Sequence, residues 1–183
     1  TRAVLDHVLN GQADVGILPY EHVLTVAVQG KRIVSFFNIA NRPVNNVIAS
    51  DKLIAGAEKL SVEEKVKRLK GQRVAMPSSG GSGEKMLGVL AKKYGLTLPG
   101  DISTVYLGAE APSYVAAFQK DLIDAALPFE PAGVWVQQAD KGKIYLNMMN
   151  GEIPEFRDIL FMTLATHPDI IKEKPDMLRK VAL

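Results

Sequence analysis

Short apolar runs alternate with amphipathic segments along most of the chain. The apolar runs predict strands at residues 13–18, 33–39, 45–49, 73–76, 104–107, 123–127, 144–148 and 159–165. Apolar residues three and four apart predict helices at residues 2–10, 21–28, 113–120, 131–142 and 169–183, the last with a break at Pro175. Alternation of strands and helices at this spacing favours an α/β fold with parallel sheets.

Two further helices carry clear start or end signals. Ser61 and Glu64 have the spacing of a capping box, which predicts a helix from Ser61 that ends at Lys70. The next helix follows residue 82, and Gly95 fits the left-handed position that ends it. Its apolar face consists of Met86, Leu87, Leu90, Ala91 and Tyr94.

A Ser/Gly-rich turn joins the strand at 73–76 to this helix. Small side chains, hydroxyls and backbone N–H groups gather there at the positive end of the helix dipole, which favours an anion site made of Ser78, Ser79, Gly80, Gly81 and Ser82. A P-loop is excluded because Gly83 is followed by Glu84 and Lys85. The dinucleotide fingerprint also fails, since Met86 stands where a third glycine is needed. A plain strand-to-helix connector remains the alternative.

Two strand ends share one pattern. Residues 14–21 and 124–131 both run from an aspartate through an apolar strand to Pro-aromatic-Glu. Ligands of open α/β sheets bind at the carboxyl ends of strands. We therefore expect a small-ligand pocket lined by the turn at 78–82 together with Pro19, Tyr20, Ala109, Glu110, Phe129 and Glu130. For Tyr20 and Phe129, the alternative is that each caps the core at a strand end.

Composition narrows the class of protein. A chain of 183 residues can form one large or two small domains. Its 22 basic and 20 acidic residues give a net charge of +2, and the scattered lysines argue against nucleic-acid binding. Absence of cysteine excludes a disulfide, a thiolate nucleophile and a zinc–thiolate site within these residues. No apolar run is long enough to insert into a membrane. The chain opens without Met or a signal peptide, and we interpret it as a fragment or processed form.

The ionisable residues do not assemble into a catalytic or metal site. His7, His22 and His167 lack metal-ligand spacing. Asp14 and Asp124 lie at strand beginnings, away from the expected pocket, and we interpret them as turn or capping residues. We therefore expect no catalytic residue, no metal and no cofactor.

Two long segments carry a family resemblance: LKGQRVAMPSSGGSGEKML at residues 69–87, and VYLGAEAPSYVAAFQKDLIDAALPFEPAG at residues 105–133. They resemble the substrate-binding proteins of ABC importers for nitrate, sulfonates and taurine, and the related NMT1-like proteins of thiamine-pyrimidine synthesis. The resemblance implies the two-lobe α/β fold of type II periplasmic binding proteins. Lobe I would comprise residues 1–43 and 158–183, and lobe II residues 44–157, with Asn41 and Arg42 in the hinge. It also implies that a strand and helix before residue 1, and an end after residue 183, are missing.

The resemblance further implies a function. A small anionic or polar molecule would be captured between the lobes, with Tyr20 approaching Phe129 and Glu130 on closure, and delivered to an ABC permease and ATPase. The protein would be a monomer in the periplasm or outside the cell, either lipid-anchored or not. Two alternatives share the fold: a periplasmic sensor domain, and an enzyme of pyrimidine synthesis or desulfination. The enzymes rely on cysteine or a metal-binding cysteine cluster, which this chain lacks.

Overall fold

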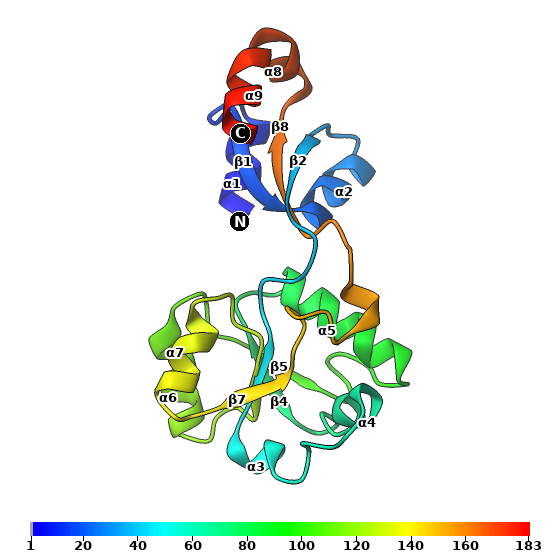
Figure 1. The fold of residues 1–183 in the computed structure, drawn as a ribbon, viewed down its shortest axis with the longest axis vertical. Helices are drawn as coiled ribbons and strands as arrows, with labels where there is room; N and C mark the ends of the chain where they lie inside the picture. The colour runs from blue at the N-terminus through cyan, green and yellow to red at the C-terminus, as the bar shows by residue number, and fades with distance from the viewer. Residues whose placement is uncertain (1) are drawn as a thin grey trace. The chain divides into compact units, whose positions relative to one another are not determined.

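The computed structural model describes residues 2–183. It divides into two compact units (Figure 1). Unit 1 comprises the residues up to Arg42 together with Arg157–Leu183, and unit 2 comprises Pro43–Phe156. Each unit has a sheet and a buried core of its own.

Unit 1 is a three-stranded sheet with helices around it. The strands lie in the order β1 (Val15–Pro19), β8 (Met162–Thr166), β2 (Val34–Ala40). The helices are α1 (Arg2–Leu9), α2 (Tyr20–Val28), α8 (Pro168–Glu173) and α9 (Pro175–Ala182). The core consists of Leu5, Val8, Leu18, Val23, Val26, Ile33 and Ala165. It therefore joins α1 and α2 to one face of the sheet.

The prediction of a parallel sheet is wrong for unit 1. Strand β8 is antiparallel to both of its neighbours, so that Leu164 lies opposite Ile17 on one side and Phe37 on the other. Strands β1 and β2 are thus parallel to each other, as expected for strands joined by a helix. They do not pair, because β8 from the far end of the chain lies between them.

Unit 2 has a five-stranded mixed sheet. Its order is β5 (Ser103–Tyr106), β4 (Arg73–Met76), β6 (Ala125–Ala126), β3 (Val47–Ala49), β7 (Lys143–Leu146). The parallel prediction holds for β5, β4 and β6. Strand β3 is antiparallel to β6 and to β7. The amino end of β3 therefore lies at the edge where the other four strands have their carboxyl ends.

Helices cover both faces of the unit 2 sheet. Figure 1 shows α6 (Ala111–Gln119) and α7 (Ala132–Gln138) on one side, and α4 (Val62–Lys67) and α5 (Ser82–Lys93) on the other. The core beneath α6 and α7 consists of Ile48, Ala75, Tyr114, Ala117, Phe118, Ile123, Ala126 and Val136. The short helix α3 (Asp51–Ile54) and the 3₁₀ turn Pro154–Phe156 were not predicted.

Three local signals in the sequence are confirmed. The Ser61 hydroxyl accepts a hydrogen bond from the Glu64 N–H at 3.3 Å, and the Glu64 carboxylate accepts one from the Ser61 N–H at 2.8 Å. Gly95 follows α5 with a φ of 77°, and Pro175 separates α8 from α9. Within residues 2–183, no helix combines the length and apolar character needed to span a membrane.

Candidate ligand-binding site

The unit 2 sheet brings most of the predicted site residues to one edge. The segments that follow β4, β5, β6 and β7, and the segment that precedes β3, all lie there. We call this the carboxyl edge, and it consists of residues 44–46, 77–81, 107–110, 127–131 and 147–149. The Gly108 N–H donates to the Pro77 carbonyl at 3.2 Å, which joins two of these segments directly. The Ser/Gly turn, Ala109 with Glu110, and Phe129 with Glu130 are therefore neighbours in the structure.

The Ser/Gly turn is tightly wound. Gly80 has a φ of 68°, which favours glycine, and a Cβ on Gly81 would lie 2.9 Å from the Ser78 hydroxyl. Ser78 and Ser79 are exposed, whereas Ser82, the first residue of α5, is buried. Of the three serines in the turn, Ser78 and Ser79 are thus the two that solvent reaches.

The chain's own carboxylate already occupies part of this turn. The Gly80 N–H donates to Glu84 Oε2 at 2.5 Å. The other oxygen of Glu84 accepts the Tyr106 hydroxyl at 2.9 Å. The turn was predicted to offer free N–H groups, and neither Glu84 nor Tyr106 was predicted to lie at it. The signal for Glu84 was its place in the first helical turn, where acidic side chains complement the dipole.

Glu130 and Glu110 lie at the beginnings of the next two helices. Glu130 Oε2 accepts the Val134 N–H at 3.0 Å, at the start of α7. A Cβ on Gly133 would lie 2.7 Å from the same carboxylate, so the Glu130 side chain packs directly against the start of the helix. Glu110 immediately precedes α6, is exposed, and makes no capping bond through its side chain. An acidic side chain therefore lies at the positive, amino-terminal end of each of the helices α5, α6 and α7 at the carboxyl edge.

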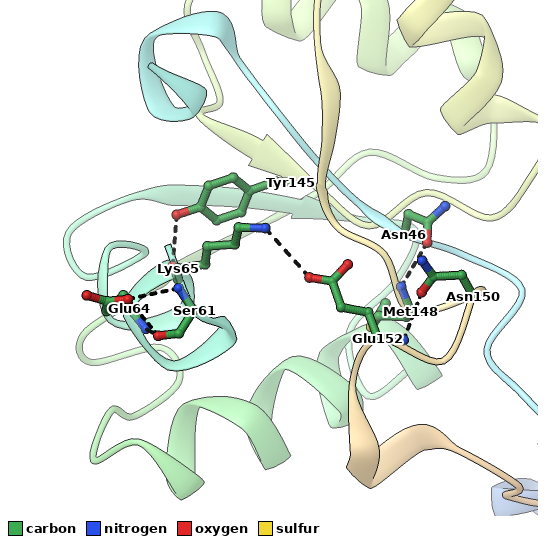
Figure 2. A network of polar contacts seen from close by, with 8 residues as sticks. All are labelled: Asn46, Ser61, Glu64, Lys65, Tyr145, Met148, Asn150 and Glu152. Carbon is green, nitrogen blue, oxygen red and sulfur yellow. Dashed lines mark hydrogen bonds and ion pairs between the residues drawn. The ribbon is translucent and has the colours of Figure 1, made fainter. Parts of the chain in front are cut away.

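Two adjacent asparagines before β3 have opposite environments. Asn46 Oδ1 accepts the N–H groups of Met148 and Met149 at 2.9 and 3.2 Å, and Figure 2 shows its side chain directed at the Met148 backbone. Asn45 is only 1% exposed, and neither of its amide atoms has a hydrogen-bond partner among the described residues. Both residues were predicted to lie in the strand at residues 45–49, and no role in a site was predicted for either. Because both residues are asparagines, the sequence alone does not indicate which side chain is hydrogen-bonded and which is unpaired.

The remaining predicted residues belong to unit 1. Pro19 ends β1 and is buried, and Tyr20 begins α2 and packs partly buried against the core. That packing agrees with the interpretation of Tyr20 as a core cap. Asn41 Nδ2 donates to Asp158 Oδ1 at 3.3 Å, and Arg42 is exposed at the end of the unit.

The two aspartates at strand beginnings form ion pairs within their own units. Both carboxylate oxygens of Asp124 accept bonds from the Arg73 guanidinium at 2.9 Å, which holds the pKa of Asp124 below its usual value. Asp14 pairs with Lys174 at 2.7 Å. Both aspartates thus have structural partners, as ion pairs and not as helix caps. Among the described residues, no group of three or more His, Asp or Glu side chains could hold a metal ion.

Comparisons with known proteins place this chain in a family. The family model described as NMT1/THI5-like matches residues 1–182. No curated protein sequence matches the chain significantly.

Several solved structures share the fold. The periplasmic aliphatic sulphonate binding protein SsuA from Escherichia coli is 17% identical, with a TM-score of 0.73 over 98% of this chain and 56% of that chain. The alkanesulfonate-binding protein SsuA from Xanthomonas axonopodis pv. citri is 18% identical, with a TM-score of 0.69 over 97% and 55%. The nitrate-binding protein NrtA from Synechocystis is 14% identical, with a TM-score of 0.66 over 96% and 47%. The chain thus spans about half the length of these proteins, and the predicted α/β fold class and family are confirmed.

Proposed function

The chain belongs to the NMT1/THI5-like family, and we propose that it binds a small polar or anionic solute outside the cytoplasm and delivers it to an ABC importer. The observation that carries this proposal is the carboxyl edge of unit 2. Three neighbouring strand ends there bring together two exposed serines, the Gly80 N–H that Glu84 holds in this structure, and the partly buried Phe129. Small-ligand sites are built from such groups at strand ends. The shared fold with sulfonate- and nitrate-binding proteins supports the same assignment.

The proposed contacts follow from this edge. The exposed hydroxyls of Ser78 and Ser79 hold the polar group of the solute. Gly80 contributes its N–H only after Glu84 releases it. The other proposed contacts are Gly81, Ser82, Ala109, Glu110, Phe129 and Glu130 in unit 2, and Pro19 and Tyr20 in unit 1.

We assign the two units the roles of lobes I and II of a binding protein. Asn41 and Arg42 lie where the chain leaves unit 1 for the first time, and Asp158 lies just after it returns. The bond between Asn41 and Asp158 ties these two passages together, as does the bond from the Phe161 N–H to the Ala40 carbonyl at 3.0 Å. These residues form the proposed hinge. One chain suffices for this role, so a monomer is expected.

The proposal involves no chemical change in the solute. It is tested first by thermal-shift measurements with nitrate, sulfate, methanesulfonate and acetamide, and then by calorimetry with whichever solute stabilises the protein most. The solute recovered after incubation should be unaltered. A solute that is converted to a product would favour an enzyme, and a protein that responds to no small polar molecule would contradict the proposal.

A double variant locates the site. Losing two hydroxyl contacts in Ser78→Ala/Ser79→Ala should weaken binding by roughly 10- to 100-fold. The matched control is Ser103→Ala, an exposed serine at the opposite end of the same sheet, which should leave affinity unchanged. Equal affinities for both variants would mean that the turn is only a connector.

A further inference from the structure

The Asn45 side chain is a buried polar group that the protein itself leaves unpaired. Both amide atoms are shielded from solvent, and neither has a hydrogen-bond partner among residues 2–183. Its neighbour Asn46 shows what a structural asparagine looks like in this fold, since it holds two backbone N–H groups (Figure 2). Buried polar side chains in native proteins are almost always satisfied, so an exception needs a physical explanation.

The amide of Asn45 lies at the carboxyl edge, beside the beginning of α5. A Cβ placed on Gly83 would be 4.0 Å from Asn45 Nδ2 and 3.6 Å from the Leu127 carbonyl oxygen. Asn45, the second residue of α5 and the end of the β6 strand therefore converge. The Ser/Gly turn at residues 78–82 immediately precedes Gly83 in the chain, so the amide lies next to the helix start that follows the turn. The unpaired amide is independent evidence for a ligand group at that point.

The acidic side chains near the start of α5 disfavour a negatively charged ligand group. The Glu84 carboxylate already takes the Gly80 N–H, and the Glu130 carboxylate takes the Val134 N–H. Glu110 adds a third negative charge before α6. One basic residue, the exposed Lys85, lies in the first turn of α5. The helix ends that would attract an oxyanion are thus complemented by the chain itself, and a further bare anion would meet repulsion.

The chemistry of the amide points the same way. Nδ2 only donates and Oδ1 only accepts, and the two atoms lie side by side. A sulfonate, nitrate or carboxylate only accepts, and would leave Oδ1 unpaired next to a negative oxygen. A carboxamide, a urea or the amino edge of a heterocycle offers one acceptor beside one donor and satisfies both atoms.

We propose that Asn45 recognises a neutral ligand group that carries an adjacent hydrogen-bond donor and acceptor, and that this site prefers such a group to a bare oxyanion. The inference rests on the proposed solute-binding function and narrows its solute class. Because both amide atoms are shielded in this structure, the ligand reaches them after neighbouring segments move apart.

Paired probes that differ only in the head group test the preference. Acetamide is compared with acetate, benzamide with benzoate, and methanesulfonamide with methanesulfonate, by thermal shift and then by calorimetry. The amide member of a pair should bind at least ~10-fold tighter than the acid. Asn45→Leu, which keeps the number and branching of the heavy atoms and removes both polar atoms, should reduce amide binding by ~10-fold or more and leave acid binding unchanged.

A second measurement needs no ligand. Asn45→Leu should melt at the same temperature as the unaltered protein or higher, because it removes an unpaired polar group. Asn46→Leu, the matched control, should melt several degrees lower because it leaves the N–H groups of Met148 and Met149 without their acceptor. If Asn45→Leu melts as low as Asn46→Leu, its amide is paired with a trapped water and the inference is overturned.

The possible failures are distinguishable. Tighter binding of the acids would overturn the inference and leave the proposed solute-binding function intact. A protein that binds neither amides nor acids would overturn both.

Discussion

Replacing Asp124 by asparagine tests whether the Arg73–Asp124 pair supports unit 2 as the structure indicates. The Asp124 carboxylate accepts bonds from the Arg73 backbone N–H, Nε and a terminal nitrogen, each at 2.9 Å. Removing hydrogen bonds to a charged group costs about 1.5–3 kcal/mol each, but such losses are not additive. The Arg73 side chain is 42% exposed, so solvent screens part of the attraction. We expect Asp124→Asn to lower the free energy of unfolding by about 1–3 kcal/mol.

The stability difference between the two proteins should also depend on pH in a definite direction. Arg73 lowers the pKa of Asp124 in the folded protein. A carboxyl group with a lowered folded pKa stabilises the fold above its unfolded pKa, which is about 4 for aspartate, and that stabilisation is lost as the pH falls through the folded value. The difference in stability between the unaltered protein and Asp124→Asn should be complete at neutral pH and should shrink as the pH falls below about 4.

Urea denaturation followed by tryptophan fluorescence measures this difference. Trp135 is the only tryptophan in the chain and lies in α7, so the signal reports on unit 2. The matched control is Glu63→Gln. In the unaltered protein the Glu63 carboxylate lies 2.6 Å from Lys67 Nζ, but the Glu63 side chain is 51% exposed. That variant should change the free energy by no more than about 0.5 kcal/mol. Equal effects of the two variants, or a difference for Asp124→Asn that persists unchanged in acid, would refute the reasoning.

Two further predictions use the same assay. The buried Tyr145 donates its hydroxyl to the Lys65 carbonyl at 2.9 Å (Figure 2), so Tyr145→Phe should cost about 1 kcal/mol; an unchanged stability would mean that this carbonyl needs no side-chain partner. A Cβ on Gly142 would lie 2.9 Å from Ile48 Cγ2, so Gly142→Ala should cost about 1–3 kcal/mol. Gly88→Ala in α5 is the control, because a Cβ on Gly88 would come no closer than 3.6 Å to a neighbour and alanine favours a helix. A loss of stability in Gly88→Ala as large as that in Gly142→Ala would contradict the steric argument.

The elements of the fold were largely predictable because they depend on local patterns. The capping box of α4, the glycine after α5 and the break at Pro175 each depend on a few adjacent residues. The boundaries were less accurate at short strands. Strand β6 was predicted over residues 123–127 and pairs only at Ala125–Ala126. The apolar run there continues past the strand because its residues are buried, and burial alone does not require pairing.

Strand pairing depends on segments that are distant in the sequence, and this is where the prediction failed. The helix between β1 and β2 indicates that these strands run in the same direction, and they do. Nothing near them reveals that β8, more than a hundred residues later, lies between them. A local pattern can indicate the direction of a strand but not the neighbour to which it hydrogen-bonds.

For the candidate site too, local features were predictable from the sequence and contacts between distant segments were not. The sequence could place Ser78, Glu110 and Glu130 at strand ends, because each follows a recognisable apolar run. It could not show which of these groups the protein pairs internally, since that depends on distances between separate segments. Glu84 folds back on the Gly80 N–H, while Asn45 finds no partner beside the same helix. In three dimensions the Gly80 N–H of the predicted anion site is therefore held by Glu84, and the polar side chain beside the same helix that lacks a partner is an amide, which both donates and accepts.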